Sequence, residues 1–462
     1  MFPKNLLPER VSNYQPFTSS YGRSATILRV LDHPYFVVWC FGLFILLRAL
    51  TLLVPLEVMF DAKMYFDRAA GIAAGEGYSQ GGYLTAYTPV GYAGFLGSLF
   101  WLFGTSQTVG AIANLVCAAA SFFLVLALTR HIFQCSRSAR LAVALLAIYP
   151  NSIAYTPLLM NETYFTFLML LGCYLFIVRQ TLPYLVVAGL VFGFMALTKP
   201  QAIFVPGFLA LLWLFTSEGW QRRWVVVART GLVYVMMACV LVPWAVRNTT
   251  VFGELVLIST NGSSLLLLGN NPSAVGGPIS DKDDPMFINR NYSVVSVEDE
   301  LAISKRARQL AIDWITSNPK RFLELIPLKI FHAWAPDGEA EWSYQKGFER
   351  YEKYRYLCRG IRVLNWGYYL LLILSFAVAI FPLWRYRHKT AWPWPLFGYV
   401  FCGYLTLLAI VFFGFSRFKF PAMPWVIMTV AWAAVHLLET KASRGAAERT
   451  HPKGTRGQEK SQ

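Results

Sequence analysis

The chain has 462 residues, of which 56% are hydrophobic and 14% are charged, and its formal net charge is +16. Soluble globular domains have about 45–50% apolar and about 25% charged residues, so this composition excludes a protein that buries its apolar side chains in one aqueous core. Several apolar runs approach the roughly 20 residues that a helix needs to cross a bilayer. The sequence therefore predicts a polytopic α-helical membrane protein.

Eight clear apolar runs, and a shorter pair separated by the turn TKPQ, predict a bundle of about ten transmembrane helices. A further apolar run, 89–104, would place every later basic connector on the opposite side of the membrane if it crossed. We therefore interpret it as a re-entrant or interface-lying helix. The predicted spans are 35–54, 106–128, 140–157, 160–178, 184–198, 201–215, 225–243, 360–383, 392–413 and 420–438.

Basic residues concentrate in the short connectors between these runs, not in one continuous patch. The positive-inside rule assigns such connectors to the cytoplasm, together with both chain termini. The excess positive charge is thus a topology signal with contact to membrane lipids, and it argues against a nucleic-acid partner. The connectors contain Arg130, Arg137, Arg140, Arg222, Arg223, Arg385, Arg387 and Lys389.

The same topology divides the chain into five parts. They are a cytoplasmic N-terminal segment (1–34), a transmembrane module (35–243) with a first external loop (55–105), an external periplasmic segment (244–358), C-terminal transmembrane helices (359–438) and a basic cytoplasmic tail (439–462). The tail is expected to be disordered.

The external segment 244–358 is predicted to be mixed α/β. Its first part has apolar, β-rich runs cut by Asn and Gly turn signals. Ser296 and Asp299 then resemble a capping box at a helix start, and a second short helix is expected over 320–335. Aromatic residues near the end of the segment suit either a membrane interface or sugar stacking.

Acidic residues follow the first apolar run directly, in VPLEVMFDAKMYFDRAAGIAAGEGY (54–78). Asp61 lies where the helix leaves the bilayer, and Tyr65, four residues on, shares its face if the stretch is helical. Asp67 lies off that face. A carboxylate at such an exit is either a solvated cap or a base, and the surrounding motif favours a base.

The order of motifs along nearly the whole chain resembles the GT-C membrane glycosyltransferases. The closest type is the protein O-mannosyltransferase-like group (glycosyltransferase family 39), which includes the lipid A aminoarabinose transferases. Val90 and Ala93 replace two prolines of the family's PPGYP helix, and Lys199 replaces the usual arginine of its LTRP element. The motifs are FDAKMYFDRAAGIAAGEGYS, YTPVGYAGFLGSLFWLFG, YPNSIAYTPLLMNETYF, GFMALTKPQAIF, PWAVRNTTVFG with GNNP, and SRFKFPAMP.

The resemblance implies transfer of a sugar from a polyprenyl-phosphate donor at the outer face of a bacterial inner (plasma) membrane. The acceptor would be an envelope glycolipid, a polymer or a protein. Such enzymes use no nucleotide sugar, and the chain has no G-x-G-x-x-G motif in a βαβ setting.

Transfer from a lipid phosphate needs a base for the acceptor hydroxyl and cations for the departing phosphate. Asp61 is the candidate base, and Glu162 is a candidate contact for the acceptor or a metal. Lys199, Arg247 and Arg417 are candidate phosphate ligands, although cations at helix ends also extend to lipid headgroups. A divalent cation shared by Asp61 and Glu162 stays an open cofactor hypothesis. The supporting candidates are Tyr65, Asp67, Tyr87 and His332.

Two other functions share much of this pattern. A lipid or sugar transporter, such as a flippase, would have internal repeats and ionisable residues near the middle of the membrane, and the sequence has neither. A membrane polysaccharide polymerase would use the same donor lipid and stays an alternative.

Overall fold

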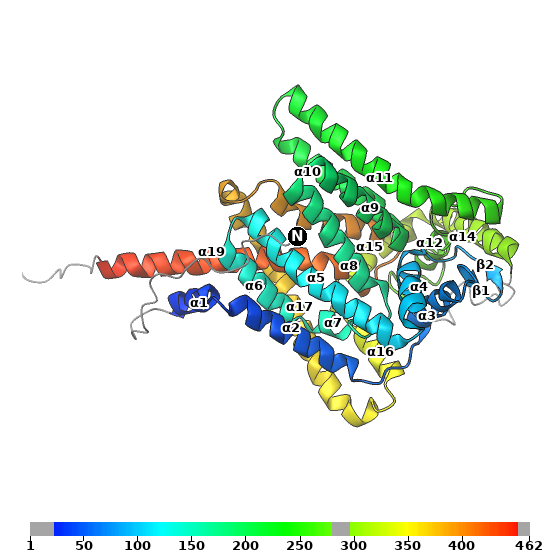
Figure 1. Ribbon diagram of the computed structural model, residues 1–462, viewed down its shortest axis with the longest axis horizontal. Coiled ribbons are helices and arrows are strands. Elements are labelled where there is room, and N and C mark those ends of the chain that lie inside the picture. Colours follow the sequence, from blue (N-terminus) through cyan, green and yellow to red (C-terminus); the bar gives the residue numbers. More distant parts are fainter. Residues whose placement is uncertain (1–22, 280–295, 451–462) are drawn as a thin grey trace, which may run out of the picture.

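A computed structural model describes residues 23–279 and 296–450, with side chains as far as residue 443. This part of the chain is almost entirely helical, as predicted, and its long helices pack into one bundle (Figure 1). The bundle helices are α1 (Arg23–Asp32), α2 (Phe36–Leu52), α5 (Gln107–Phe133), α6 (Ser136–Ala147), α8 (Asn161–Tyr174), α9 (Leu182–Thr198), α10 (Val205–Thr216), α11 (Trp220–Phe252), α17 (Arg355–Arg385), α18 (Phe397–Val411) and α19 (Met423–Thr450).

Among the described residues, six helices are long and apolar enough to cross a membrane. A seventh is added if α1 and α2, which meet at a bend of 81°, form one span. The apolar helices α9 and α10 are shorter. The prediction of a polytopic helical membrane protein is thus confirmed, and the count of about ten spans stays a prediction.

The apolar run 140–157 does not form one helix, which corrects the predicted span. Helix α6 ends at Ala147, and the short helix α7 (Pro150–Ala154) begins after a break. Pro150 lacks an N–H group and disfavours helical geometry at the preceding Tyr149, which is extended (φ −68°, ψ 107°). The break frees the carbonyl of Ala147, and the buried Arg48 guanidinium of α2 donates to it at 3.4 Å.

Small residues allow a close contact between α9 and α11. Gly189 and Gly193 lie one turn apart on α9 and face α11. A Cβ at Gly189 would come within 2.5 Å of the Val233 carbonyl oxygen, and one at Gly193 within 2.6 Å of Val240 Cβ. This is the small-x-x-x-small pattern that lets membrane helices approach backbone to backbone.

Segment 55–105, predicted to be the first external loop, forms a compact group at one end of the bundle, called here the Asp61 end (Figure 1). It contains α3 (Phe60–Ala73), α4 (Gly91–Phe103) and a two-residue hairpin, β1 (Ser79–Gln80) and β2 (Tyr83–Leu84), paired with Ser79 opposite Leu84. At 1.5 Å per residue, α4 is about 20 Å long, less than the roughly 30 Å hydrocarbon core. Because the predicted span α9 is also shorter than this core, the re-entrant or interface-lying placement of 89–104 stays a prediction.

The expected β structure of segment 244–358 is wrong for its described residues, which contain helices and no strand. These helices are α12 (Gly262–Gly269), α14 (Val297–Ser317), α15 (Pro319–Trp334) and α16 (Glu339–Gly347). The leucine run within α12 favours helix, and α12 packs along α14, so tertiary contact decided the outcome. The predicted cap is confirmed, because Ser296 Oγ accepts from the Asp299 N–H at 3.2 Å.

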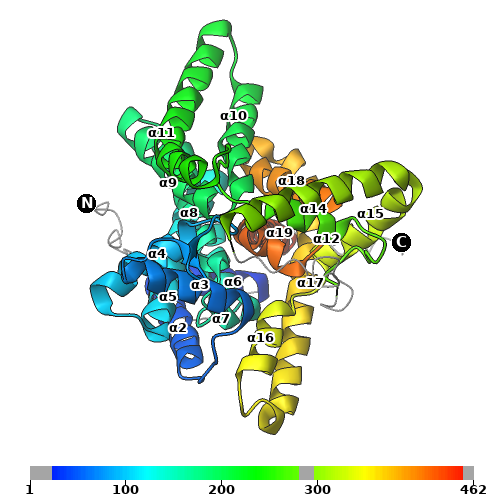
Figure 2. The same ribbon diagram turned by 90° about the vertical axis from the view of Figure 1, so that its right-hand side faces the viewer.

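Viewed from the Asp61 end, α3 and α4 lie on one side and α12, α14 and α15 on the other (Figure 2). The predicted boundaries at 243 and 358 fall inside α11 and α17. Helix α19 continues to Thr450, so the first part of the tail is helical and not disordered as expected.

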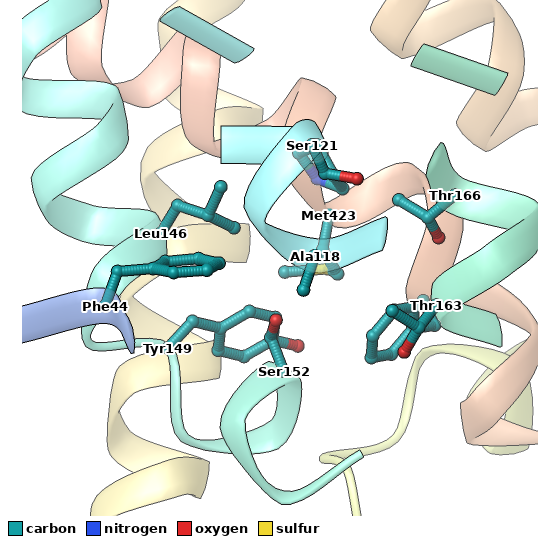
Figure 3. A pocket seen from close by; sticks show the side chains of 11 residues that line it. Phe44, Ala118, Ser121, Leu146, Tyr149, Ser152, Thr163, Thr166 and Met423 are labelled. Carbon is teal, nitrogen blue, oxygen red and sulfur yellow. The ribbon is translucent and has the colours of Figure 1, made fainter. Parts of the chain in front are cut away.

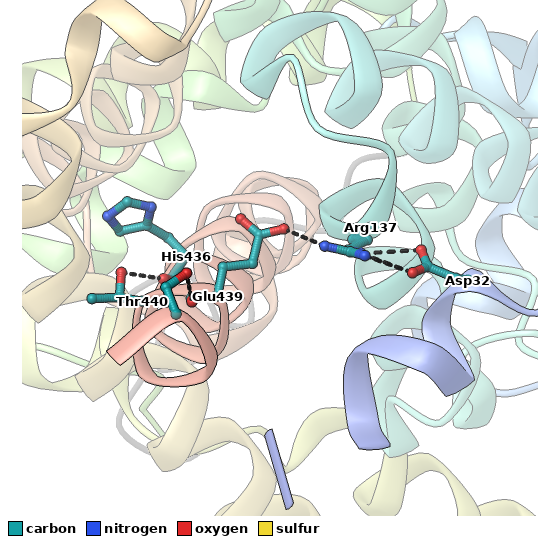
Figure 4. Close-up of polar contacts among 6 residues, drawn as sticks. Asp32, Arg137, His436, Glu439 and Thr440 are labelled. Carbon is teal, nitrogen blue, oxygen red and sulfur yellow. Dashed lines mark hydrogen bonds and ion pairs between the residues drawn. The ribbon is translucent and has the colours of Figure 1, made fainter. Parts of the chain in front are cut away.

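At the opposite end of the bundle, Arg137 of α6 joins two helices from distant parts of the chain (Figure 4). Its guanidinium lies 2.6 Å from Asp32 of α1 and 2.9 Å from Glu439 of α19. All three side chains are partly exposed, so solvent screens both ion pairs and their contribution to stability is small.

Backbone contact also fixes the loop after α18 against α15. The Gly414 N–H donates to the Gly276 carbonyl at 2.9 Å, and a Cβ at Gly414 would overlap the Lys329 carbonyl oxygen. The ammonium of the fully buried Lys329 in turn donates to Asn270 Oδ1 at 2.8 Å. Segment 244–358 is thus anchored to α18 at a place where no side chain fits.

We expect Gly414→Ala to destabilise the protein by about 1–3 kcal/mol, because the added methyl group meets backbone that cannot rotate away. Gly403→Ala, in open space on α18, is the matched control and should leave stability unchanged or slightly higher. Thermal unfolding of the purified proteins in one detergent measures the difference. Equal unfolding temperatures for the two variants would contradict the tight contact.

Candidate active site

Charged side chains from five distant segments meet at the Asp61 end. Three of them are carboxylates in the first turn of a helix: Asp61 on α3, Glu162 on α8 and Glu339 on α16. A helix N-terminus carries partial positive charge, so a carboxylate is favourable there. The cations are Lys199, at the C-terminus of α9, and Arg417, in the 3-10 helix η6 (Ser416–Ala422).

Arg417 is the centre of this cluster. Its Nη1 lies 2.7 Å from Asp61 Oδ2 and 3.7 Å from Glu339 Oε1. It also interacts electrostatically with Glu162. The Arg417 side chain is 18% exposed and that of Asp61 is 44% exposed, so Asp61 forms the open edge of the cluster.

Glu162 and Lys199 form the buried part of the cluster. Lys199 Nζ lies 3.1 Å from Glu162 Oε1, and the two side chains are 11% and 2% exposed. Burial lowers the pKa of the Lys199 ammonium from its usual value, and the Glu162 carboxylate acts in the opposite direction. Lys199 also interacts electrostatically with Asp61 and Arg417. Four residues singled out from the sequence are therefore brought together.

Three buried polar atoms in the cluster have no protein hydrogen-bond partner among the described residues: Glu162 Oε2, Arg417 Nε and Tyr155 Oη. Tyr155 precedes α8 and interacts electrostatically with Glu162, Glu339 and Arg417. Because most buried polar groups in proteins are hydrogen-bonded, a concentration of such atoms is typical of a binding site.

The other residues singled out from the sequence have different surroundings. Tyr65 Oη accepts from Asn161 Nδ2 at 2.8 Å, directly beside Glu162, and so supports the cluster. Asp67 forms an exposed ion pair with Lys63 at 3.0 Å. The remaining candidates, Arg247, Tyr87 and His332, make contacts that involve backbone atoms. Arg247 donates to the carbonyls of Tyr78 and Thr85, the Tyr87 carbonyl accepts from the Asn261 N–H, and the His332 ring packs on Gly277.

Arg247 thus holds the hairpin loop of segment 55–105, with its guanidinium 3.0 Å from the Tyr78 carbonyl oxygen and 2.8 Å from that of Thr85. The buried Glu300 of α14 holds the same loop, because it accepts from the Thr85 hydroxyl and the Ala86 N–H. These contacts belong to the support of the loop and lie apart from the Asp61 cluster.

Sequence reasoning missed Glu339, Tyr155 and the ion pair of Asp337 with Lys419. The pair lies beside the cluster, with its atoms 2.8 Å apart and both side chains almost fully buried. Its one sequence signal is matched spacing, because Asp337 and Glu339 are two residues apart, like Arg417 and Lys419.

The hypothesis of a divalent cation shared by Asp61 and Glu162 does not fit the donors present. Asp61 is paired with Arg417, and Glu162 with Lys199, so each carboxylate already faces a cation. Within residues 23–279 and 296–450, no group of three His, Cys, Asp or Glu side chains converges as a metal site would require.

A small cavity of about 30 Å³ lies next to the cluster, between α2, α5, α8 and α19 (Figure 3). Figure 3 shows the hydroxyl groups of Tyr149, Ser152, Thr163 and Thr166 around it. Most of its lining is apolar, and a space of this size is too small for a sugar.

Residues 88–246 match the model of the dolichyl-phosphate-mannose-protein mannosyltransferase family. No curated protein sequence matches the chain.

Among solved structures, the oligosaccharyltransferase of Archaeoglobus fulgidus is similar in its apo form (12% identity, 93% of this chain and 54% of that chain, TM-score 0.51). The same enzyme tethered to an acceptor peptide is similar at 13% identity, over 92% of this chain and 52% of that chain, with a TM-score of 0.51. ArnT from Cupriavidus metallidurans, bound to undecaprenyl phosphate, overlaps 90% of this chain and 80% of its own at 15% identity and a TM-score of 0.41.

The chain spans about half the length of the oligosaccharyltransferase, so the likeness concerns the membrane fold. That fold and the family match over residues 88–246 agree with the order of motifs along the sequence. The family match covers about a third of the chain, and the structural likeness shows a shared fold; both agree with the GT-C membrane glycosyltransferases that the motifs resemble.

Proposed function

We propose that this protein transfers a sugar from a polyprenyl-phosphate donor to an acceptor hydroxyl or phosphate at the Asp61 end of the bundle, on the periplasmic face of the membrane. One observation carries the proposal. A partly exposed carboxylate, Asp61, lies within one charge cluster with two largely buried cations, Arg417 and Lys199, at the end of a membrane bundle. A base beside a phosphate-binding pair is what this transfer requires.

In this mechanism, Asp61 takes the proton of the acceptor hydroxyl as its oxygen attacks the anomeric carbon of the donor. The bond from that carbon to the phosphate oxygen breaks, and its electron pair leaves with the polyprenyl phosphate. One displacement of this kind inverts the configuration of the sugar. The open edge at Asp61 lets the acceptor reach the base, and general-base assistance contributes about 10²–10⁴-fold.

Arg417 and Lys199 stabilise the charge that develops on the departing phosphate. In the structure Arg417 is paired with Asp61, so an incoming phosphate competes with that carboxylate for the guanidinium. Phosphate binding would release Asp61 toward the acceptor. Glu162 then positions Lys199, because its Oε1 accepts a hydrogen bond from the Lys199 ammonium.

A cleft of about 700 Å³ lies at the same end, and we propose it as the place where the acceptor binds, although no residue of the charge cluster lines it. One wall is the loop 52–57, which leads from α2 into the helix of Asp61, and the other is 346–350, which follows α16. Apolar residues such as Leu56 and Phe348 alternate with charged ones such as Glu57 and Arg350, which suits a glycan with an attached lipid.

The first test compares Asp61→Asn with wild type in lipid nanodiscs, with a panel of radiolabelled polyprenyl-phosphate sugars and a membrane extract as acceptor. We expect wild type to transfer one sugar and Asp61→Asn to lose about 10²–10⁴-fold of that rate. Asp67→Asn, on the same helix but in an exposed ion pair, is the matched control and should keep its activity. A well-folded Asp61→Asn with normal activity would refute the base, and a wild type that consumes no donor would direct attention to a lipid-flipping assay.

A second test uses the stability cost of the cluster. Burial raises the pKa of the Glu339 carboxyl above its usual value, despite the attraction of Arg417. Because the pKa is raised in the folded state, ionised Glu339 lowers the folding stability. This loss is absent below the unfolded-state pKa and develops as the pH rises through the folded-state pKa. Glu339→Gln should therefore unfold at a higher temperature than wild type at about pH 8, with a smaller difference at about pH 5.

Glu341→Gln is the control for this measurement, since it removes another carboxylate of α16, one paired with Arg362. It should lower the unfolding temperature because an ion pair is lost. If Glu339→Gln is destabilised at every pH, the Glu339 carboxylate is a net stabiliser and the interpretation of its raised pKa is wrong.

A further inference from the structure

Two ion pairs join the loop before α16 to the 3-10 helix η6. Asp337 Oδ1 lies 2.8 Å from Lys419 Nζ, and two residues away on each segment Glu339 Oε1 lies 3.7 Å from Arg417 Nη1. The inner pair is 4% and 1% exposed, whereas Arg417 and Glu339 are both 18% exposed. The two pairs differ in how many of their donor and acceptor groups have hydrogen-bond partners.

Lys419 has no donor left for a substrate. An ammonium has three N–H groups, and this one meets three acceptors: Asp337 Oδ1, the Ala335 carbonyl at 2.6 Å and the Ser416 carbonyl at 3.0 Å. The Ser416 carbonyl belongs to the peptide unit that links Ser416 to Arg417. Lys419 therefore holds the backbone from which the Arg417 side chain projects.

Asp337 is fixed just as firmly. Its Oδ2 accepts from the Tyr149 hydroxyl at 2.6 Å, and its carbonyl accepts from Trp366 Nε1 at 3.1 Å. The first contact ties it to the start of α7 and the second to α17. A buried polar network that is fully bonded is rigid, and removing one member leaves an uncompensated group.

Arg417, by contrast, has a buried Nε that finds no protein partner in the described part of the chain, and its Nη1 faces the partly exposed Asp61. We infer that the Asp337–Lys419 pair is a positioning device for Arg417. It fixes the turn at Ser416 so that the guanidinium faces the donor phosphate, and it makes phosphate binding depend on the docking of residues 335–339. The inference rests on the proposed function, which assigns the phosphate to Arg417.

The test measures binding of undecaprenyl phosphate to the full-length protein in nanodiscs, for wild type, Asp337→Asn, Arg417→Gln and the double variant. Arg417→Gln should weaken binding by about 10–100-fold, because a charge-assisted bond to phosphate is lost. Asp337→Asn should weaken it by about tenfold, and the double variant should bind no more weakly than Arg417→Gln, since residues that act through one group are not additive.

Two further variants protect the test against simple unfolding. Asp337→Asn combined with Lys419→Met removes both charges, so no unpaired ion is left buried, and it should still bind weakly. Tyr149→Phe deletes one hydroxyl and should reduce affinity by about twofold to fivefold, again without effect in the Arg417→Gln background. Glu341→Gln, an ion-pair loss on the same helix outside the cluster, should bind like wild type.

The two proposals fail in different ways. If wild type does not bind undecaprenyl phosphate, or if Arg417→Gln binds it equally well, the phosphate assignment of the proposed function is refuted. If Arg417→Gln binds weakly while Tyr149→Phe and the charge-free pair bind like wild type, the positioning role alone is refuted. Additive losses with Arg417→Gln would also refute it, because they indicate a structural effect independent of Arg417.

Discussion

The need to compensate one largely buried guanidinium, that of Arg417, organises the Asp61 end of this protein. Removing a charge from water costs several kcal/mol unless partners replace the solvent. For Arg417 these partners come from α3, α8 and α16, which are far apart in the sequence. Its position therefore requires that the first loop, the membrane bundle and segment 244–358 fold against one another, and the charge cluster is a consequence of that assembly.

Much of this arrangement is encoded locally and was predicted. Apolar run length indicates which segments enter the membrane, and helix-end positions explain why Asp61, Glu162 and Lys199 lie at one end. Contacts between distant segments carry no periodic signal, so Glu339 and Asp337 were missed. Arg247 was assigned to phosphate as a cation at a helix end, and its contacts with the carbonyls of Tyr78 and Thr85 cannot be inferred from its neighbours in the sequence.

The incorrect secondary-structure predictions also have local causes. The run 140–157 is apolar throughout, yet one proline restricts the residue before it and divides the helix. The runs after residue 253 looked extended because of their Asn and Gly turn signals, yet the leucines of α12 pack along α14 as a helix. In both cases a helix boundary or a packing partner outweighed the composition of the run.

The short helices near the cluster affect the membrane itself. Helices α4 and α9 pack together through Gly91, where a Cβ would meet Thr198 and the carbonyl carbon of Leu197. With 13 and 17 residues, they are about 20 and 25 Å long, shorter than the roughly 30 Å hydrocarbon core. Helix α4 is interpreted as re-entrant or interface-lying, so the mismatch concerns α9, whose run is a predicted span; local thinning of the bilayer is one way in which a short span is accommodated. The lipid headgroups beside Lys199 would then lie closer to the bilayer midplane, which shortens the path of a lipid-linked phosphate from the surrounding leaflet to the two cations.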